Sequence, residues 1–152
     1  MNFYTTSTFR QTLESLTKKP REGYGSVTKD IVKAFQSMPD TIIRDTNDRI
    51  KHYADFRVVK LRLPNSGQHL SRPDGFRLIY WVSMTTDDVV LLRVYPKRGP
   101  QGTVDLVDGE YDRLLLEMVH ESQLKTLHQV DIANQLAELS TEGTLHKQMS
   151  DV

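Results

Sequence analysis

The chain has 152 residues, with 20 Lys and Arg against 20 Asp and Glu, 38% apolar residues and no cysteine. This size and composition predict one modest folded domain, and they exclude a disordered polymer, a disulfide scaffold and a cysteine-based zinc site. The chain shows no signal-peptide pattern and no apolar run long enough to span a bilayer. We therefore expect a cytoplasmic protein with no membrane partner.

The zero net charge is distributed unevenly. Residues 1–55 carry nine basic and seven acidic residues, residues 56–98 carry eight and three, and residues 99–152 carry three and ten, so the net charges are +2, +5 and −7. A basic centre next to an acidic tail indicates a polyanion site in the central segment. The counts alone favour an ordinary solvated surface.

Helical spacing dominates the first third of the chain. Apolar residues recur at i, i+4 and i+7 in a first predicted helix, which follows Thr6 and ends before Pro20. A second helix is expected over residues 26–38, where the next proline ends it. The same pattern predicts a third helix over residues 40–50.

Strand patterns begin at Phe56. Residues 56–63 alternate, with Lys60 and Arg62 on one face and apolar residues on the other. Further strands are expected over residues 76–82 and 89–95, and the last of these is almost continuously apolar. Short connections rich in turn-forming residues favour an antiparallel meander.

The last third again has helical spacing. One helix is expected to begin at Asp108 or Asp112, and a second is expected to contain Leu124, Leu127 and Leu139, before a frayed end. Helices, then consecutive strands, then helices predict an α+β fold.

Basic residues on the strands are the candidates for chemistry. Lys60 and Arg62 share one strand face, and Arg77 lies on the next strand of the hairpin, so these cations converge if the register is as inferred. The third strand and its exit carry four more candidates, namely Arg93, Tyr95, Lys97 and Arg98. Spacing alone also fits packed or ion-paired cations and a core tyrosine.

Three short segments, in order, resemble the RelE/ParE toxin superfamily, and most closely its RelE/HigB-type members. They are Lys60-Leu61-Arg62, Gly75-Phe76-Arg77-Leu78-Ile79-Tyr80 and Val94-Tyr95-Pro96-Lys97-Arg98-Gly99. The resemblance covers roughly residues 1–117. It implies a toxin domain with an N-terminal strand, a helical hairpin and a small, mainly antiparallel sheet. Residues 118–152 are then an acidic, helical C-terminal extension packed on the same domain.

The resemblance implies a toxin of a type II toxin–antitoxin system, which cleaves mRNA in the ribosomal A site and so inhibits translation. It implies catalytic roles for Lys60, Arg77 and Arg98. The residues expected to bind RNA are Arg62, Arg72, Arg93, Tyr95 and Lys97. The expected partners are a cognate antitoxin, the ribosome and mRNA, in a homodimer or a toxin–antitoxin hetero-oligomer.

The chemistry fits these residue types. Attack by a ribose 2′-hydroxyl needs a proton acceptor, stabilisation of the charge on the phosphorane and assistance to the leaving 5′-oxygen. Positive neighbours favour the neutral amine of a lysine, so Lys60 is the candidate general base. Arg77 and Arg98 can hold a phosphate through paired hydrogen bonds. The mechanism uses no metal or other cofactor, and no histidine spacing specifies a metal.

The sequence departs from the RelE pattern at one functional position. The tyrosine that follows the Lys-Arg pair in the family aligns with Val104, so Tyr95 or Tyr111 would have to replace it. Two alternatives therefore stay open. One is a ParE-like inhibitor of DNA gyrase that does not cleave RNA, and the other is a degenerate toxin that acts only as a protein-binding module.

The acidic tail also has two interpretations. In one, its apolar stripe packs on the domain or on another chain while its acids face water. In the other, four acids lie near the basic cluster and lower its affinity for RNA: Glu110, Asp112, Glu117 and Glu121.

Overall fold

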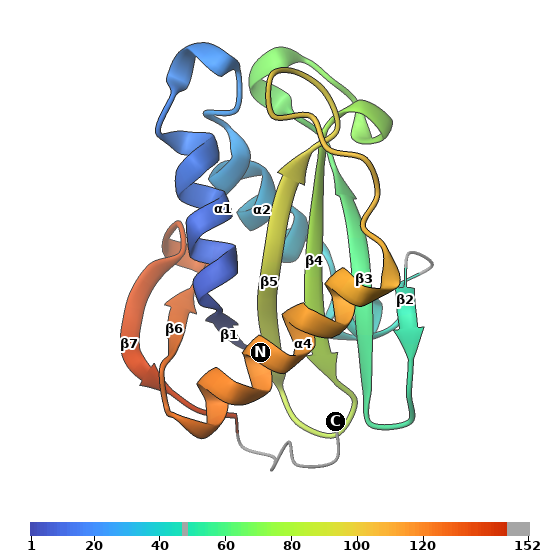
Figure 1. Ribbon diagram of the computed structural model, residues 1–152, viewed down its shortest axis with the longest axis vertical. Coiled ribbons are helices and arrows are strands. Elements are labelled where there is room, and N and C mark those ends of the chain that lie inside the picture. Colours follow the sequence, from blue (N-terminus) through green and yellow to red (C-terminus); the bar gives the residue numbers. More distant parts are fainter. Residues whose placement is uncertain (47–48, 146–152) are drawn as a thin grey trace.

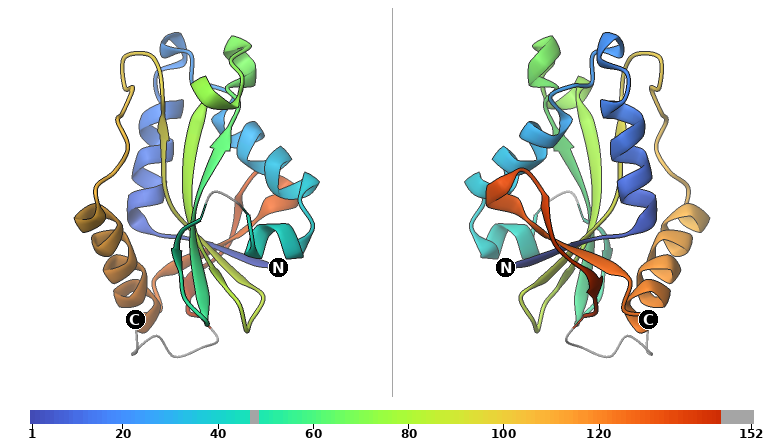
Figure 2. Two further views of the ribbon diagram at one scale, coloured as in Figure 1. Left: turned by 90° about the vertical axis from the view of Figure 1, so that its right-hand side faces the viewer. Right: turned by 90° about the vertical axis from the view of Figure 1, so that its left-hand side faces the viewer.

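The protein is described by a computed structural model over residues 1–46 and 49–145. Its centre is a seven-stranded sheet with the order β2-β3-β4-β5-β1-β6-β7, in which β1 is parallel to β5 and the other pairs are antiparallel (Figure 1). Helices lie on both sides of this sheet (Figure 2). The α+β class expected from the sequence is confirmed.

The elements follow one another in an order that begins with a strand and two helices. The helices are α1 (Ser7–Thr17), α2 (Val27–Ser37), the short α3 (Asp40–Arg44) and α4 (Asp108–Gln123). The strands are β1 (Asn2–Thr5), β2 (Arg49–His52), β3 (Phe56–Leu63), β4 (Phe76–Ser83), β5 (Asp88–Pro96), β6 (Leu127–Asp131) and β7 (Ala137–Gly143). No helix in these described ranges is long and apolar enough to cross a membrane.

The central meander agrees closely with the predicted strands. β3, β4 and β5 begin and end within one residue of the expected bounds and pair antiparallel. Gly75 makes the approach to β4 possible, since a Cβ there would lie 2.0 Å from the carbonyl oxygen of Leu63. Such a contact is sterically forbidden, so only glycine fits at this position.

Two apolar clusters pack on opposite faces of the central strands. On β4, Phe76, Leu78 and Tyr80 belong to the cluster beneath α1 and α2, which defines the α2 face. Ile79 and Trp81 belong to the cluster beneath α4, which defines the α4 face. The alternation of a strand places successive side chains on these two faces in turn.

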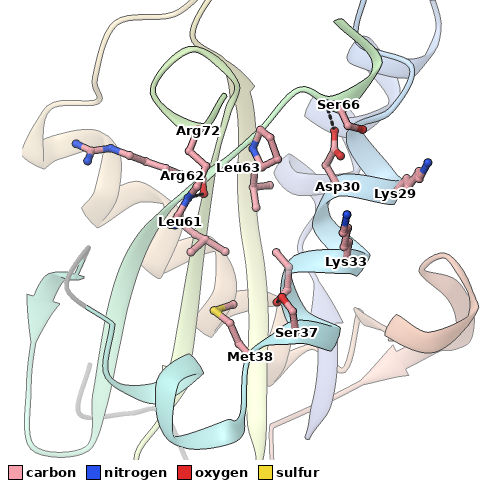
Figure 3. Close-up of a pocket in the computed structure, with 12 residues that line it drawn as sticks. Lys29, Asp30, Lys33, Ser37, Met38, Leu61, Arg62, Leu63, Ser66 and Arg72 are labelled. Atoms are coloured by element: carbon pink, nitrogen blue, oxygen red, sulfur yellow. Dashed lines mark hydrogen bonds between the residues drawn. The ribbon is translucent and has the colours of Figure 1, made fainter. Parts of the chain in front are cut away.

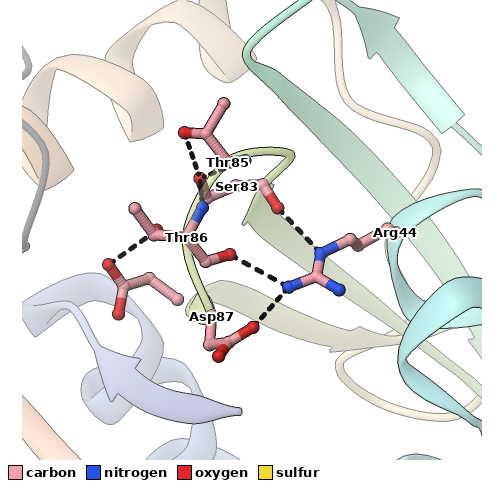
Figure 4. Close-up of polar contacts among 6 residues, drawn as sticks. Arg44, Ser83, Thr85, Thr86 and Asp87 are labelled. Atoms are coloured by element: carbon pink, nitrogen blue, oxygen red, sulfur yellow. Dashed lines mark hydrogen bonds and ion pairs between the residues drawn. The ribbon is translucent and has the colours of Figure 1, made fainter.

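The predicted third helix is wrong in its second half. α3 ends at Arg44, and residues 49–52 form β2, an edge strand that pairs with β3. Arg44 fixes the end of α3 against the β4–β5 turn: Nε donates to the carbonyl of Ser83 at 3.2 Å, and Nη2 donates to the carbonyl of Thr86 at 3.0 Å and to Asp87 at 2.6 Å (Figure 4). Pairing with β3 then satisfies backbone groups that a longer helix would have left unpaired on that strand.

The expected extra C-terminal helices are also wrong in part. α4 is present, but the segment containing Leu127 and Leu139 forms the β6–β7 hairpin instead of a second helix. Lys125 adopts φ 57° directly after α4 and ends it, and β6 then pairs with β1 through Phe3 and Val130. Apolar spacing in a short segment fits a helix or a strand equally well. The segment forms a strand because β1 has an edge with which it can pair.

Candidate functional site

Strand register brings most of the predicted residues onto the α4 face. Directly opposite residues form two rows across β3, β4 and β5, namely Arg62–Arg77–Tyr95 and Lys60–Ile79–Arg93. We call Lys60, Arg62, Arg77, Arg93 and Tyr95 the cationic face. The predicted convergence of Lys60, Arg62 and Arg77 on one sheet face is therefore confirmed by the register.

Arg77 is a buried residue, with only 5% of its surface exposed. Its Nη1 donates to the carbonyl oxygens of Arg72 at 2.9 Å and Phe76 at 3.2 Å, and its Nη2 donates to that of Pro73 at 2.9 Å. The guanidinium thus holds the 3₁₀ turn Arg72–Asp74 that leads into β4. In this conformation Arg77 is anchored to backbone and shapes the loop beside the cationic face.

Lys60 and Arg93 each face an acid from the segment that follows β5. Lys60 Nζ lies 3.4 Å from Asp105 Oδ1, and Arg93 Nη1 lies 3.3 Å from Glu110 Oε2. The Arg93 guanidinium carbon also lies 5.5 Å from the centre of the Tyr95 ring, within the range of a cation–π interaction. Both cations are mostly covered, because their side chains are 17% and 26% exposed.

Neither candidate tyrosine is presented to a ligand. Tyr95 is buried, and its hydroxyl has no hydrogen-bond partner among the described residues. Burial raises the pKa of Tyr95 strongly, with smaller contributions from Tyr111 and Asp105. Burial also raises the pKa of Tyr111, which packs in the first turn of α4. Val104, the position that aligns with the family tyrosine, is 81% exposed.

The remaining candidates lie at the end of the sheet where β3 leaves and β4 enters. Arg98 is exposed and pairs with Asp74 at 2.8 Å, so its contacts tie it to the turn before β4. Arg72 Nε donates to the carbonyl of Arg62 at 3.1 Å. The side chain of Arg62 is exposed, and Lys97 is half-buried.

Sequence reasoning missed Lys51 as part of this surface. It lies on β2 opposite Val58, a residue of the α4 face, and its Nζ is 3.6 Å from Asp112 Oδ1. Because residues 40–50 were expected to be one helix, no strand register was available to place it. The short run Arg49-Ile50-Lys51-His52, close before a turn and β3, was the one signal for an edge strand.

Two of the four acids expected near the basic cluster form ion pairs with basic residues of this surface. Glu110 and Asp112 pair with Arg93 and Lys51, as described above. Glu117 instead accepts from the backbone N–H of Thr8 at 3.1 Å, and Glu121 accepts from that of Ser7 at 3.1 Å. These two carboxylates satisfy free donors at the start of α1 and favour its helix dipole. They tie α4 to α1, and Glu117 also lines a surface hollow together with Arg93 and Glu110.

A cavity of about 310 Å³ lies between α2 and β3, and its lining includes Arg62 of the cationic face and Arg72 (Figure 3). Lys29 and Lys33 stand on α2 at its rim, and neither forms an ion pair with another described residue. Asp30 is buried beside them, accepting from Ser26 Oγ at 2.8 Å and from the backbone N–H of Ser66 at 3.1 Å. The cavity is lined by none of the three residues implied as catalytic.

Comparisons with protein-family models, with curated proteins and with solved structures find no match. Within residues 1–46 and 49–145, no three His, Asp or Glu side chains come together in an arrangement that could hold a metal ion. The arrangement that does stand out is a sheet face carrying four cations, two of them directly opposite each other. Such a face can bind a polyanion and stabilise negative charge on a phosphate.

Proposed function

We propose that the protein is a RelE/HigB-like toxin of a type II toxin–antitoxin system. In this proposal it is a ribosome-dependent endoribonuclease that cleaves mRNA in the A site, inhibits translation in the cytoplasm and is inhibited by a cognate antitoxin. The observation that carries the proposal is the direct cross-strand pairing of Arg62 with Arg77 beside Lys60. Like charges directly opposite each other destabilise a sheet. A bound phosphodiester offsets that repulsion.

Each cation has a distinct place in the proposed reaction. The neutral amine of Lys60 accepts the proton of the ribose 2′-hydroxyl as the 2′-oxygen attacks the phosphorus, and the exposed Arg62 and Arg98 contact the phosphate. The bond between the phosphorus and the 5′-oxygen then breaks, which leaves a 2′,3′-cyclic phosphate, and the leaving 5′-oxygen takes a proton from water. Arg77 sits beneath them and fixes the 72–75 turn, so its contribution includes positioning Arg72. The antitoxin, the ribosome and mRNA are the proposed partners, in a homodimer or a toxin–antitoxin hetero-oligomer.

A non-catalytic protein-binding module is the second candidate. The observation that favours it is the burial of groups that a nuclease needs to present. Arg77 is anchored to three backbone carbonyls, and the Tyr95 hydroxyl is covered. A ParE-like gyrase inhibitor is a third reading, which predicts DNA damage on expression and no RNA cleavage.

Primer extension on mRNA in a purified translation system tests the proposal, with and without ribosomes. Wild type should give discrete cuts that require ribosomes. Lys60→Ala should slow cleavage by about 10²–10⁴-fold, the usual contribution of a general base. Lys18→Ala is the matched control, because Lys18 is an exposed lysine after α1, away from the cationic face. Intact mRNA under all conditions, or equal cleavage by Lys60→Ala and Lys18→Ala, would contradict the nuclease.

A further inference from the structure

The segment between β5 and the second turn of α4 lies across the cationic face. We call residues 103–112 the acidic strap. Three of its acids pair with three cations on three different strands or strand ends: Asp105 with Lys60 at 3.4 Å, Glu110 with Arg93 at 3.3 Å and Asp112 with Lys51 at 3.6 Å. The strap therefore places carboxylates where the phosphates of a polyanion would bind.

Polar atoms under the strap are left without partners. Among the described residues, Tyr95 Oη and Arg93 Nε are buried and form no hydrogen bond. Buried polar groups in folded proteins are nearly always hydrogen-bonded, because losing their contacts with water is costly. The closed position of the strap is therefore unfavourable for these two groups. Displacement of the strap would return them to water or to a ligand.

The strap is attached in a way that permits this displacement. Its paired acids Asp105 and Asp112 are 59% and 63% exposed, and ion pairs at such exposed sites are weak and screened by salt. Val107 is also largely exposed, so two side chains of the strap pack in the apolar cluster of the α4 face: Leu106 and, in the first turn of α4, Tyr111.

Glu110 links the strap to the start of α4. One of its carboxylate oxygens pairs with Arg93, and the other accepts from the backbone N–H of Val107 at 3.3 Å. The ordered first turn of α4 and the covering of Arg93 therefore depend on the same carboxylate. Loss of the Arg93 contact and loosening of the strap are expected to occur together.

We propose that the acidic strap is autoinhibitory. It occupies the cationic face as a mimic of phosphates, and the backbone of single-stranded RNA competes with it for the same cations. The proposal rests on the proposed function for its substrate class and specifies how that site is regulated. Since the three cations lie under the strap, the closed protein binds RNA only in the fraction of time in which the strap is displaced.

RNA affinity tests this competition without requiring cleavage. The strap variant combines Asp105→Asn, Glu110→Gln and Asp112→Asn. The matched control combines Glu14→Gln, Asp40→Asn and Glu142→Gln, which removes the same charge from exposed acids on α1, α3 and β7. Fluorescence anisotropy with a short unstructured single-stranded RNA measures both. We expect the strap variant to bind about tenfold more tightly than the control, because the apparent Kd is divided by the fraction of open protein. Equal affinities would overturn the proposal.

Amide hydrogen exchange of the wild type provides a readout that net charge does not affect. When RNA is added, the amides of residues 103–110 should exchange faster if RNA displaces the strap. Slower exchange there would mean that RNA binds over a closed strap, and this result would overturn the proposal. Asp105→Asn alone serves as the folding-safe variant, since Asp105 is exposed and its side chain pairs with Lys60. It should show a smaller gain in RNA affinity in the same direction.

Failure of this inference is distinguishable from failure of the nuclease. If the strap variant binds RNA more tightly than its charge-matched control but cleaves no mRNA on ribosomes, the strap proposal holds and the nuclease is wrong. If wild type cleaves mRNA while affinity and exchange are the same with and without the strap acids, the nuclease holds and the strap proposal is wrong.

Discussion

The two sides of β4 show the same strand performing two different tasks. On the α2 face it carries Phe76, Leu78, Tyr80 and Val82, all of them buried in one apolar cluster. On the α4 face it carries Trp81 and Ile79 under α4, and then Arg77 at the end near the acidic strap. The comparison teaches that β4 is apolar along its whole length on the α2 face, whereas on the α4 face it also carries charge that a purely structural sheet has no need to keep.

The two faces are also closed by different interactions. Aromatic and aliphatic contacts close the α2 face, such as the edge-to-face pair of Phe35 and Tyr80 with ring centres 5.3 Å apart. On the α4 face, half-exposed ion pairs join the acidic strap to Lys51, Lys60 and Arg93. Apolar burial contributes far more to folding than ion pairs of this kind. Substitutions on the two faces should therefore separate stability from RNA binding.

The largest expected effect is on the α2 face. Ile31→Ala removes a fully buried side chain of α2 and leaves a cavity, so it should lower the free energy of unfolding by about 3 kcal/mol. RNA affinity of the folded protein should not change. Urea denaturation followed by circular dichroism measures the loss. Ile42→Ala, at a residue of α3 that is 46% exposed, is the control and should change stability by less than about 0.5 kcal/mol. If Ile31→Ala and Ile42→Ala lowered the free energy of unfolding equally, the prediction that the α2 face is a stabilising core would be wrong.

Arg77→Met should have the next largest effect on stability. It tests whether a buried cation of the α4 face also contributes to folding. The variant removes the guanidinium hydrogen bonds to the carbonyls of Arg72, Phe76 and Pro73, at a cost of about 2 kcal/mol in unfolding free energy. Arg62→Met, in the same cross-strand row but exposed, should cost less than about 0.5 kcal/mol. If both variants were equally stable, Arg77 would have no structural role, and its burial would serve the site alone.

The smallest expected effect on stability comes from a single group of the α4 face, the hydroxyl of Tyr95. Tyr95→Phe removes a buried oxygen that has no partner in the described part of the chain, and should raise the free energy of unfolding by about 1 kcal/mol at neutral pH.

The same variant should alter the response to alkali. Burial raises the pKa of Tyr95 in the folded protein, so above about pH 10 the unfolded chain loses this proton while the folded chain keeps it. Stability of the wild type should then fall by about 1.4 kcal/mol per pH unit for each such tyrosine. Urea titrations at several pH values should give a shallower fall for Tyr95→Phe. An unchanged slope would show that the Tyr95 hydroxyl is accessible to water.

Local sequence pattern predicted the central strands of the sheet well, but it failed for the outer strands β2 and β6. Alternation along residues 56–63 fixed both the strand and the face of Lys60 and Arg62, because the period of a strand depends only on the local backbone. β2 and β6 depend on partners far away in sequence: Arg49 pairs with Val59, and Val130 pairs with Phe3. The apolar spacing of β6 fits a helix as well as a strand, and for β2 the short run before a turn and β3 was the one local signal.

For the candidate site, the sequence predicted which residues share a strand face but not the contacts that their side chains make. That Arg77 shares a face with Lys60 follows from alternation and a hairpin register. That its guanidinium turns onto backbone carbonyls depends on the three-dimensional path of the 72–75 turn, which the sequence does not state. The position of Asp105 over Lys60 likewise depends on how the segment after β5 folds back across the sheet.

The place of β1 within the sheet has a consequence for the timing of folding. β1 lies between β5, which starts at Asp88, and β6, which ends at Asp131, so β1 needs partners that are synthesised much later than itself. At about 5–20 residues per second, β1 waits roughly ten seconds for β6 to be synthesised. During this interval its backbone donors and acceptors lack their strand partners, and long-range pairing of this kind is slow. Assembly of the sheet is therefore completed late, when the β6–β7 hairpin pairs with the first strand of the chain.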